Sequence, residues 1–427
     1  MHDGRGEVVV TGLGPVTAVG VGCDALWTSL ATGRSNVTVR NLQVDAACFQ
    51  ELPIASMPSC DEVPGLDKHA RSLKEQGWEG YRDLGYALLA MELALTDARL
   101  TYDRTDNKIG VIQAFEAPGV ECTVSSLFTL LASPAAPTGP PPVYEMLAPR
   151  FYNMQPFSYV HVTGKAFGLH GFSTSVHNAC SSGAYAVELA AQHIRSGQAD
   201  IMVVVGGEAF DTAVRLEWFR RLELYAQEGC MRPFDAEPQG FFVGEGAAAI
   251  VLESAEHAAS RGAEPYARYL GGAFAHQGWK QTIPDVRSAR LAGVICDALA
   301  IADCTAADVD FIVPHGAATS LSDGYEAYCI EQGIGAQLRT DASDGVVATA
   351  FKPYVGHMLA ASGIIDTLCA LLAMRHRSIP ATLHTRPDRV RFPAPLVTTR
   401  LDRTVKTLLK LFTGFTGHDA ALVFRGL

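Results

Sequence analysis

Apolar residues form short continuous runs that alternate with longer segments of helical periodicity along the whole chain. The runs at 7–13, 108–114 and 201–207 predict buried strands, and the segment 81–100 predicts a long helix. A second series of strand-like runs and helical segments follows from residue 265 onward, with strands at 265–275, 309–316, 345–350 and 421–426 and helices at 287–302, 322–332 and 358–374. Strands that alternate with helices in this way predict an α/β fold built in layers.

The first series closes with GAAAIVLESAEHAASRG at 246–262, close to the middle of the chain. A length of 427 residues suffices for two domain-sized cores or for one large, internally duplicated one. The first half is interrupted by a proline-rich insertion, LLASPAAPTGPPPVYEM at 130–146, which predicts an extended surface loop. Two interpretations of this loop stay open: it caps the mouth of a site, or it is a solvated connection.

Composition narrows the class of protein. A hydrophobic fraction of 48% with 19% charged residues describes a compact protein, and a formal net charge of −11 argues against nucleic-acid binding. We find no run of about 18 uncharged apolar residues and no secretory pattern at the N-terminus, so we expect no membrane span and a cytoplasmic location. The 10 cysteines form no C-x-x-C pair, so neither a disulfide framework nor a metal site is expected.

One cysteine lies in an unusual context. The stretch VHNACSSGA at 176–184 stands between a β-prone run and a segment of helical periodicity, which places Cys180 at a strand-to-helix turn. Free backbone N–H groups and the positive end of the helix dipole favour a thiolate at such a turn. The alternative is a buried cysteine that packs as a small hydrophobic residue.

Two histidines share this context. His315 ends an apolar strand in FIVPHGAATS, and His357 precedes a long apolar helix in KPYVGHMLAASG. Active sites of α/β folds gather at such carboxyl ends of strands. Lys352 is a further candidate, because a buried ammonium group can fix a carboxylate or tune an imidazole, although a snorkelling surface lysine is the alternative.

The order ACSSG, HGAAT and K-x-x-x-G-H resembles the Cys-His-His signature of the β-ketoacyl-acyl-carrier-protein synthases, the elongating condensing enzymes of the thiolase superfamily. The resemblance extends over nearly the whole chain. It includes the opening segment 8–35, the segment RPFDAEPQGFFVGEGAAAIVLE at 232–253 and the closing segment GFTGHDAALVF at 414–424.

The resemblance implies a thiolase-like five-layer αβαβα fold of two similar halves. Residues 1–254 would carry the nucleophilic cysteine, and residues 255–427 the two catalytic histidines. It also implies a homodimer, or a heterodimer with a second ketosynthase-like chain. Cys180 would accept an acyl group from an acyl carrier protein, and a malonyl-type extender would lose carbon dioxide beside His315 and His357. No resident cofactor is implied, because phosphopantetheine arrives on the carrier protein.

Further roles follow from the same resemblance. The backbone N–H groups of Cys180 and Phe415 would form the oxyanion hole, Phe415 would gate the site, and Lys352 would support it electrostatically. Binding of the pantetheine arm is expected at four positions, namely Thr319, Ala317, Gly414 and Gly417.

Several positions depart from the family's usual residues. Ala317 stands where a threonine is usual, which removes one hydroxyl, and Asp366 stands where a glutamate is common. The closing loop, usually GFGGTN, reads GFTGHD here. These departures favour a specialised pathway of type II polyketide or fatty-acid assembly.

Three alternatives remain open. A ketosynthase-like partner subunit with little condensing activity of its own would usually lack the cysteine, and a thiolase would need a second cysteine near its C-terminus, but none follows Cys369. A purely structural or binding protein on the same scaffold is the third.

A carrier protein is acidic, so its docking site must be basic. The segment 214–225, with Arg215, Arg220 and Arg221, is one candidate. The segment 67–76, with Lys68, Arg71 and Lys74, is the other. Either segment is also compatible with an ordinary solvated helix face.

Overall fold

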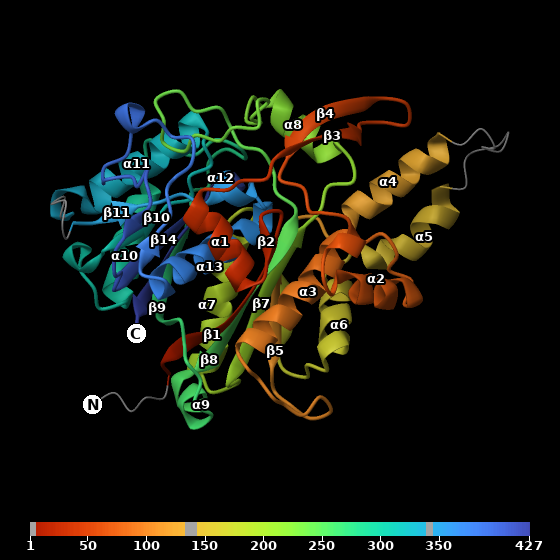
Figure 1. The fold of residues 1–427 in the computed structure, drawn as a ribbon, viewed down its shortest axis with the longest axis horizontal. Helices are drawn as coiled ribbons and strands as arrows, with labels where there is room; N and C mark the ends of the chain where they lie inside the picture. Colours follow the sequence, from red (N-terminus) through yellow and green to blue (C-terminus); the bar gives the residue numbers. More distant parts are fainter. Residues whose placement is uncertain (1–5, 133–142, 339–344) are drawn as a thin grey trace.

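The strands of the chain form one long, strongly twisted sheet made of two halves (Figure 1). The computed structural model describes residues 6–132, 143–338 and 345–427. In the first half the strand order is β1-β8-β7-β5-β6, with bounds β1 Val8–Thr17, β5 Gly110–Ala114, β6 Ser173–Val176, β7 Ile201–Glu208 and β8 Gly246–Ser254. In the second half it is β9-β15-β14-β10-β11, with bounds β9 Ala267–His276, β10 Phe311–Val313, β11 Val347–Ala348, β14 Thr407–Gly414 and β15 His418–Gly426. The predicted alternation of strands and helices is confirmed.

The two half-sheets meet only at the start of β1. There Val8, Val9 and Val10 pair antiparallel with residues 267–269 of β9. Beyond this short contact the two half-sheets face each other across a shared core, because residues of both pack in one apolar cluster with two helices between them. These helices are α7 (Ser182–Arg195) and α13 (Ser362–Arg375).

The central strands of each half-sheet, such as β7 and β14, are buried on both faces, and alternate residues point to opposite sides. In β7, Met202 and Val204 pack on the central helices, whereas Val203 and Val205 face an outer layer that contains α3 (Arg82–Asp97) and α6 (Pro156–Phe167). In β14, Leu408 and Phe412 face the centre, and Leu409 and Leu411 face α10 (Arg290–Ile301) and α11 (Ser320–Ile334).

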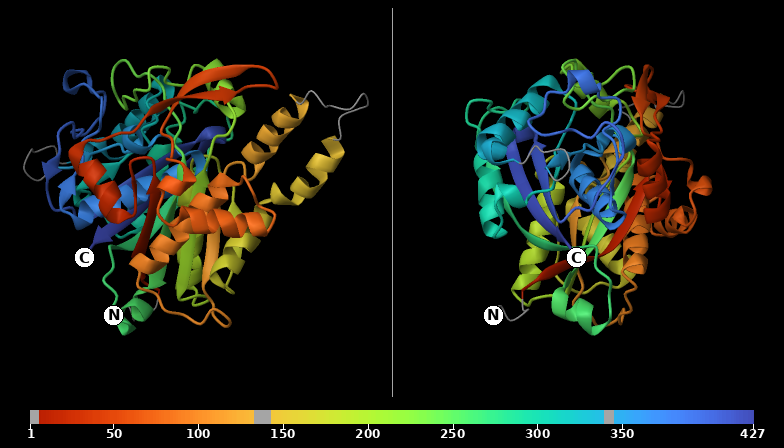
Figure 2. Two further views of the ribbon diagram at one scale, coloured as in Figure 1. Left: turned by 45° about the vertical axis from the view of Figure 1, so that its right-hand side comes forward. Right: turned by 60° about the vertical axis from the view of Figure 1, so that its left-hand side comes forward.

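This arrangement gives five layers, in the order helix, sheet, helix, sheet, helix (Figure 2). The predicted thiolase-like αβαβα fold is therefore confirmed. The predicted boundary between residues 254 and 255 falls where β8 ends and α9 begins, and the division into two domains there stays a prediction.

The central helices touch through a pair of glycines near their N-termini. A Cβ atom added at Gly183 of α7 would lie 2.8 Å from the backbone nitrogen of Ile364 in α13. One added at Gly363 would lie 3.3 Å from the Cα of Gly183 and 2.8 Å from the ring of Phe412. Any side chain at these positions would push the two helices apart, so the glycines hold the turns before α7 and α13 close together.

The remaining elements cover the edges and ends of the layers. The helices are α1 (Cys23–Thr32), α2 (Leu66–Glu75), α4 (Val120–Leu131), α5 (Val143–Asn153), α8 (Val214–Arg221), α9 (Ala255–Ser260) and α12 (Lys352–Val355). The short strands are β2 (Gly20–Val21), β3 (Thr38–Gln43), β4 (Phe49–Ile54), β12 (Ser378–Ile379) and β13 (Leu401–Asp402). Within the described ranges, no helix combines the length and apolar character needed to cross a membrane.

The proline-rich insertion falls mainly on residues 133–142, outside the described part of the chain. Its two ends are helical rather than extended, because α4 runs to Leu131 and α5 begins at Val143. The predicted surface loop is therefore shorter than the segment 130–146. The helices α4 and α5 project together from the body of the molecule (Figure 1).

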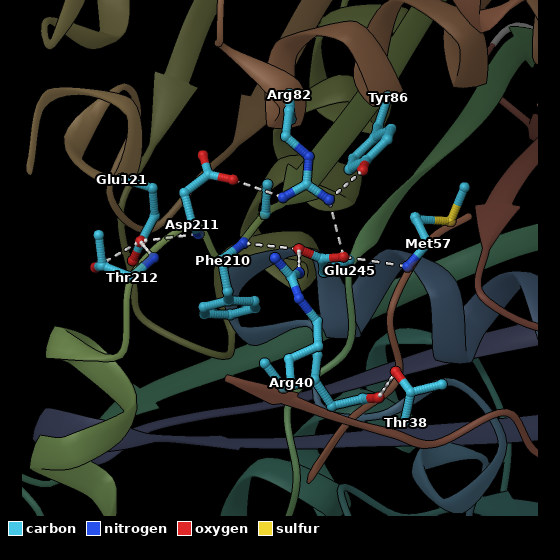
Figure 3. Close-up of polar contacts among 12 residues, drawn as sticks. Thr38, Arg40, Met57, Arg82, Tyr86, Glu121, Phe210, Asp211, Thr212 and Glu245 are labelled. Carbon is cyan, nitrogen blue, oxygen red and sulfur yellow. Dashed lines mark hydrogen bonds and ion pairs between the residues drawn. The ribbon is translucent and has the colours of Figure 1, made fainter. Parts of the chain in front are cut away.

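A buried carboxylate, Glu245, ties the first residues of α3 to the segment that precedes β8 (Figure 3). Its side chain is fully buried and accepts hydrogen bonds from Arg40 at 2.8 Å and Arg82 at 3.0 Å. The backbone N–H groups of Met57 and Phe210 donate to it as well, at 3.1 and 3.0 Å. Four donors compensate the desolvation of one carboxylate, which explains a charged residue inside the apolar GEGA segment.

The glycine contact predicts a sharp difference between two glycine substitutions. Gly183→Ala should lower the free energy of unfolding by about 1–3 kcal/mol, because backbone atoms of α13 leave no room for the methyl group. Gly293→Ala, in α10, should raise it by up to about 1 kcal/mol, because an added Cβ there meets nothing within 4 Å. Chemical denaturation measures both, and equal effects of the two substitutions would contradict the proposed helix contact.

Candidate active site

Cys180 lies in the turn between β6 and α7, as the sequence predicts. The preceding residue, Ala179, has a φ of 49°, a left-handed conformation that is costly for a residue with a side chain. The Ser182 hydroxyl stabilises the turn: it accepts from the Asn178 N–H at 2.8 Å and donates to the Ala179 carbonyl at 2.7 Å. The turn therefore holds the sulfur in a fixed position.

The structure brings Cys180, His315 and His357 together. One ligand-type atom from each, the sulfur and two imidazole nitrogens, lies within 4.8 Å of the others. The two imidazole rings are 5.3 Å apart between centroids and nearly perpendicular, at 75°. Three turns from distant parts of the sequence thus meet in one place.

The His315 backbone is held by a buried carboxylate of α11. Glu326 accepts the His315 N–H at 2.6 Å and the Gly316 N–H at 3.0 Å. Asp323, one helical turn earlier, accepts the Ala318 N–H at 3.0 Å. Both carboxylates lie on the face of α11 that meets the turn, so they fix its conformation.

The His357 backbone pairs with the segment before β8. Its N–H donates to the Phe242 carbonyl at 2.8 Å, and its carbonyl accepts the Gly244 N–H at 3.1 Å. Gly244 must lack a side chain, because a Cβ there would lie 1.9 Å from the Val355 carbonyl oxygen. Nδ1 of the His357 ring hydrogen-bonds the Ser362 hydroxyl at 2.6 Å, which leaves Nε2 for the site.

Lys352 is fully buried, so the alternative of a snorkelling surface lysine is wrong. Its Nζ donates to the His315 carbonyl at 2.6 Å and to Asp366 at 2.7 Å. A second buried lysine, Lys410 of β14, lies 3.3 Å from the same Asp366 oxygen. It also donates to the carbonyls of Pro314 and Leu411, at 3.1 and 2.9 Å. Two ammonium groups therefore share one carboxylate directly behind His315.

This charge distribution keeps both imidazoles neutral. Burial lowers the pKa of His315 and of His357 well below the usual range, and the charges of Lys352 and Lys410 lower both further. The same positive charges disfavour a divalent cation, although the spacing of the sulfur and the two nitrogens would suit one. A neutral imidazole pair that donates hydrogen bonds is the chemistry that this environment supports.

The expectation of a thiolate at rest is wrong. Burial raises the pKa of Cys180 to about 12, and the nearby carboxyl of Glu116 adds to the rise. Lys352 and a hydrogen bond from the Phe415 N–H act in the opposite direction, but they are weaker than burial. The resting sulfur is therefore a thiol, and its proton must leave as the sulfur attacks.

The loop between β14 and β15 closes over the sulfur. Phe415 donates its backbone N–H to Cys180, which places this donor beside the sulfur, and its ring contacts Trp218 and Phe219 at 5.8 and 6.1 Å between centroids. Thr416 has a φ of 64° at the position where GFGGTN carries a glycine. The Ser181 hydroxyl donates to the His418 carbonyl at 2.7 Å and ties the loop to the start of α7.

One cavity of about 200 Å³ connects these groups. Its walls include the two histidines and the sulfur, together with all four positions predicted to bind the pantetheine arm, Ala317, Thr319, Gly414 and Gly417. Both glycines are needed for packing: a Cβ at Gly414 would lie 3.0 Å from the Ser181 hydroxyl, and one at Gly417 would lie 2.7 Å from the Cβ of Gln277. Ala317 presents a methyl group where the family usually has a hydroxyl.

The basic residues of the two candidate docking segments differ in their exposure. Arg215 is a poor surface contact, because its side chain is only 17% exposed and forms ion pairs with Glu121 at 2.8 Å and Glu208 at 3.0 Å. Arg220 and Arg221 remain partly exposed and pair with Glu217. In the segment 67–76 the three basic side chains are at least half exposed and pair with nearby carboxylates, Lys68 with Glu92, Arg71 with Asp67 and Lys74 with Glu79.

Three residues that support the cluster of Cys180, His315 and His357 were not predicted from the sequence. Lys410 had a signal, since a lysine inside the apolar run TLLKLF must be buried with a partner. The sequence signal for Glu326 was weaker. Asp323 and Glu326 are spaced to share one face of a helix that begins after His315. Ser362 carried no signal that separates it from any other helix-start serine.

Comparisons with known proteins agree with this geometry. Residues 5–258 match the family model of the β-ketoacyl synthase N-terminal domain, and residues 266–386 match that of the C-terminal domain. The 3-oxoacyl-[acyl-carrier-protein] synthase 2 of Rhizobium meliloti (strain 1021) is 30% identical over 98% of this chain and 98% of its own length. The protein named "Putative polyketide beta-ketoacyl synthase 1" of Streptomyces halstedii is 27% identical, with 98% of both chains covered. The solved structure of the ishigamide ketosynthase/chain length factor has a TM-score of 0.82 at 27% identity and covers 99% of this chain and 100% of its own.

The layered fold and the buried Cys-His-His cluster define a condensing enzyme of the thiolase superfamily. The chain belongs to the β-ketoacyl synthase family, since the two family models together match most of its length. It is an acyltransferase of the 3-oxoacyl-[acyl-carrier-protein] synthase type. The resemblance seen in the sequence motifs is confirmed.

The shared carboxylate behind His315 predicts unequal effects of two substitutions. Asp366→Asn removes the carboxylate that contacts both Lys352 and Lys410, so it should lower the free energy of unfolding by about 3–5 kcal/mol. Lys352→Met should cost less, because Lys410 still balances Asp366. Chemical denaturation at pH 7 measures both, and a larger loss for Lys352→Met would contradict this charge arrangement.

Lys410 predicts a pH-dependent contribution to stability. Burial lowers its pKa to about 8 in the folded protein, whereas an unfolded lysine titrates at about 10.4. Between these values the unfolded chain binds more protons than the folded one, so rising pH favours folding. The unfolding free energy of the wild type minus that of Lys410→Met should therefore grow by on the order of 2 kcal/mol from pH 7 to 10. A difference that stays flat over this range would show that Lys410 keeps an ordinary pKa.

Proposed function

We propose that the protein catalyses the decarboxylative condensation of an acyl group on Cys180 with a malonyl-type extender on an acyl carrier protein, in type II polyketide or fatty-acid assembly. The observation that carries this proposal is the cluster of one thiol and two neutral imidazoles, within 4.8 Å of one another, in a single cavity. The departures at Ala317 and in the closing loop favour a specialised pathway.

The first half-reaction transfers the acyl group. The Cys180 sulfur attacks the thioester carbonyl of the acyl carrier protein, and the backbone N–H groups of Cys180 and Phe415 stabilise the oxyanion. The new carbon–sulfur bond forms as the bond to phosphopantetheine breaks. Cys180 loses one proton and the leaving phosphopantetheine thiolate gains one, so the step balances.

The second half-reaction forms the carbon–carbon bond. The extender's carboxylate leaves as carbon dioxide, and its electron pair moves into an enolate whose oxygen accepts hydrogen bonds from His315 and His357. The enolate carbon attacks the acyl thioester on Cys180. The sulfur leaves and is reprotonated, and the β-ketoacyl product remains on the carrier protein.

The neutral state of the imidazoles supports this division of roles. A protonated histidine would hold an enolate as an ion pair and would make carbon attack less favourable, whereas a neutral one donates a hydrogen bond without quenching the nucleophile. Burial, with the charges of Lys352 and Lys410 as a smaller cause, keeps both rings neutral, and the lysines add a positive field for the enolate charge.

The proposal includes partners that the chain's relatives suggest. An acyl carrier protein delivers both substrates on its phosphopantetheine arm, so the enzyme needs no cofactor of its own. The exposed basic residues of 67–76, together with Arg220 and Arg221, offer an acidic carrier a landing surface. A homodimer, or a heterodimer with a ketosynthase-like chain, is part of the proposal, as is a location in the cytoplasm.

A ketosynthase-like subunit with little condensing activity is the second candidate. It is compatible with the likeness to the ishigamide ketosynthase/chain length factor. The complete cluster of Cys180, His315 and His357 favours the active enzyme, because a non-catalytic subunit has no need for all three.

The two half-reactions should separate by mutation. Cys180→Gln should abolish condensation but leave measurable conversion of malonyl- to acetyl-carrier protein, because decarboxylation needs donors to the carbonyl oxygen and no sulfur. His315→Ala and His357→Ala should each slow decarboxylation about a hundred- to a thousandfold, while Cys180 still becomes acylated.

Mass spectrometry of the carrier protein and of the intact enzyme measures both steps. His170→Ala, at an exposed histidine, is the matched control and should behave as the wild type. Folded variants at His315 and His357 that decarboxylate as fast as the wild type would overturn the assignment.

A further inference from the structure

A buried carboxyl group, Glu116, lies in the active-site cavity and has no role in the steps above. It follows β5, the strand that pairs with β6 before Cys180 and with β7 on its other side. Glu116 and Cys180 line the same cavity. The Glu116 charge also raises the pKa of Cys180, as expected for two groups in the wall of one cavity.

One oxygen of this carboxyl is unpartnered. Oε2 of Glu116 is shielded from solvent and has no hydrogen-bond partner among the described residues. Buried polar atoms nearly always have a partner, so an orphan oxygen that borders a cavity indicates a ligand group that completes the site.

The two neighbouring carboxyl groups, Glu208 and Glu121, accept hydrogen bonds from other residues. Glu208 accepts the Glu116 N–H at 3.4 Å and an Arg215 N–H at 3.0 Å. Arg215 also donates to Glu121 at 2.8 Å. Glu121 in turn accepts the N–H and the hydroxyl of Thr212, at 3.0 and 2.9 Å (Figure 3). Of these three carboxyls only Glu116 lines the cavity, and the other two form ion pairs with Arg215.

The chemistry of the Glu116 carboxyl suits a ligand group that can both donate and accept a hydrogen bond. Burial raises its pKa, and the Arg215 charge opposes this rise. A carboxyl group in this state accepts a hydrogen bond through its lone pairs and, when protonated, donates one. A hydroxyl group matches either state, whereas a methylene group matches neither.

We propose that Glu116 is a specificity-determining residue that hydrogen-bonds a hydroxyl group on the acyl chain carried by Cys180, near its thioester. An unsubstituted chain in the same place would cover Oε2 with methylene groups and leave it unpaired. The site therefore favours hydroxylated acyl groups and disfavours plain ones. Its substrate must come from a reaction that leaves or adds a hydroxyl near the thioester, such as reduction of a β-ketone.

This inference depends on the proposed acylation of Cys180, so the test compares two donors of equal length. Butanoyl- and 3-hydroxybutanoyl-carrier protein differ only by the hydroxyl group. We expect the wild type to acylate Cys180 from the hydroxylated donor on the order of tenfold faster, measured by intact mass over time.

Substitutions at Glu116 should change this ratio in a defined way. Glu116→Leu should slow transfer of 3-hydroxybutanoyl about tenfold to a hundredfold and accelerate transfer of butanoyl, which reverses the preference. Glu116→Gln keeps a donor and an acceptor and should retain most of the preference. If Glu116→Leu does not fold, Glu116→Ala provides the same comparison.

Glu121→Gln is the matched control, because Glu121 pairs with the same Arg215 but does not line the cavity. Its donor ratio should equal that of the wild type. Equal rates from both donors in the wild type, or a ratio that Glu116→Leu leaves unchanged, would overturn the role of Glu116 while the proposed function stands. Failure of every acyl donor to modify Cys180 would instead overturn the proposed function, and this inference with it.

Discussion

The contact between Gly183 and Gly363 is the constraint on which the active site depends. It lets α7 and α13 cross without side chains between them, near the ends from which the catalytic turns lead. Cys180 precedes one helix and His357 the other, so the closeness of the helices sets the closeness of the two groups. The packing of two central helices thereby determines the distance between two groups in the active-site cavity.

The two halves of the chain contribute different chemical groups to the active site. The second half supplies the electrostatics, because Lys352, Asp366 and Lys410 all come from residues after 350. The first half supplies the thiol and the carboxyl groups of Glu116 and Glu208, whose pKa values burial raises. Ammonium groups on one side of the cavity and carboxyl groups of raised pKa on the other suit a reaction in which negative charge develops only transiently.

The sequence was sufficient to predict the layered fold and the three central residues. Both depend on local signals: apolar runs with turn positions for the strands, and a reactive residue type at each of three turns. The state of Cys180 was mispredicted because a helix N-terminus is visible in a sequence, whereas the burial that outweighs it is not. Arg215 was misplaced for the same reason, since its partners Glu121 and Glu208 are distant in sequence or lie on another element.

Two ammonium groups, those of Lys352 and Lys410, contact one oxygen of Asp366 behind His315, and the charge of Glu326 also acts on both. Ammonium groups held beside a cavity of low dielectric stabilise negative charge that develops inside it. The free enzyme is therefore already prepared for the enolate before any substrate enters. Molecules that imitate that enolate should find the site preassembled, and neutral ketones of the same shape should not.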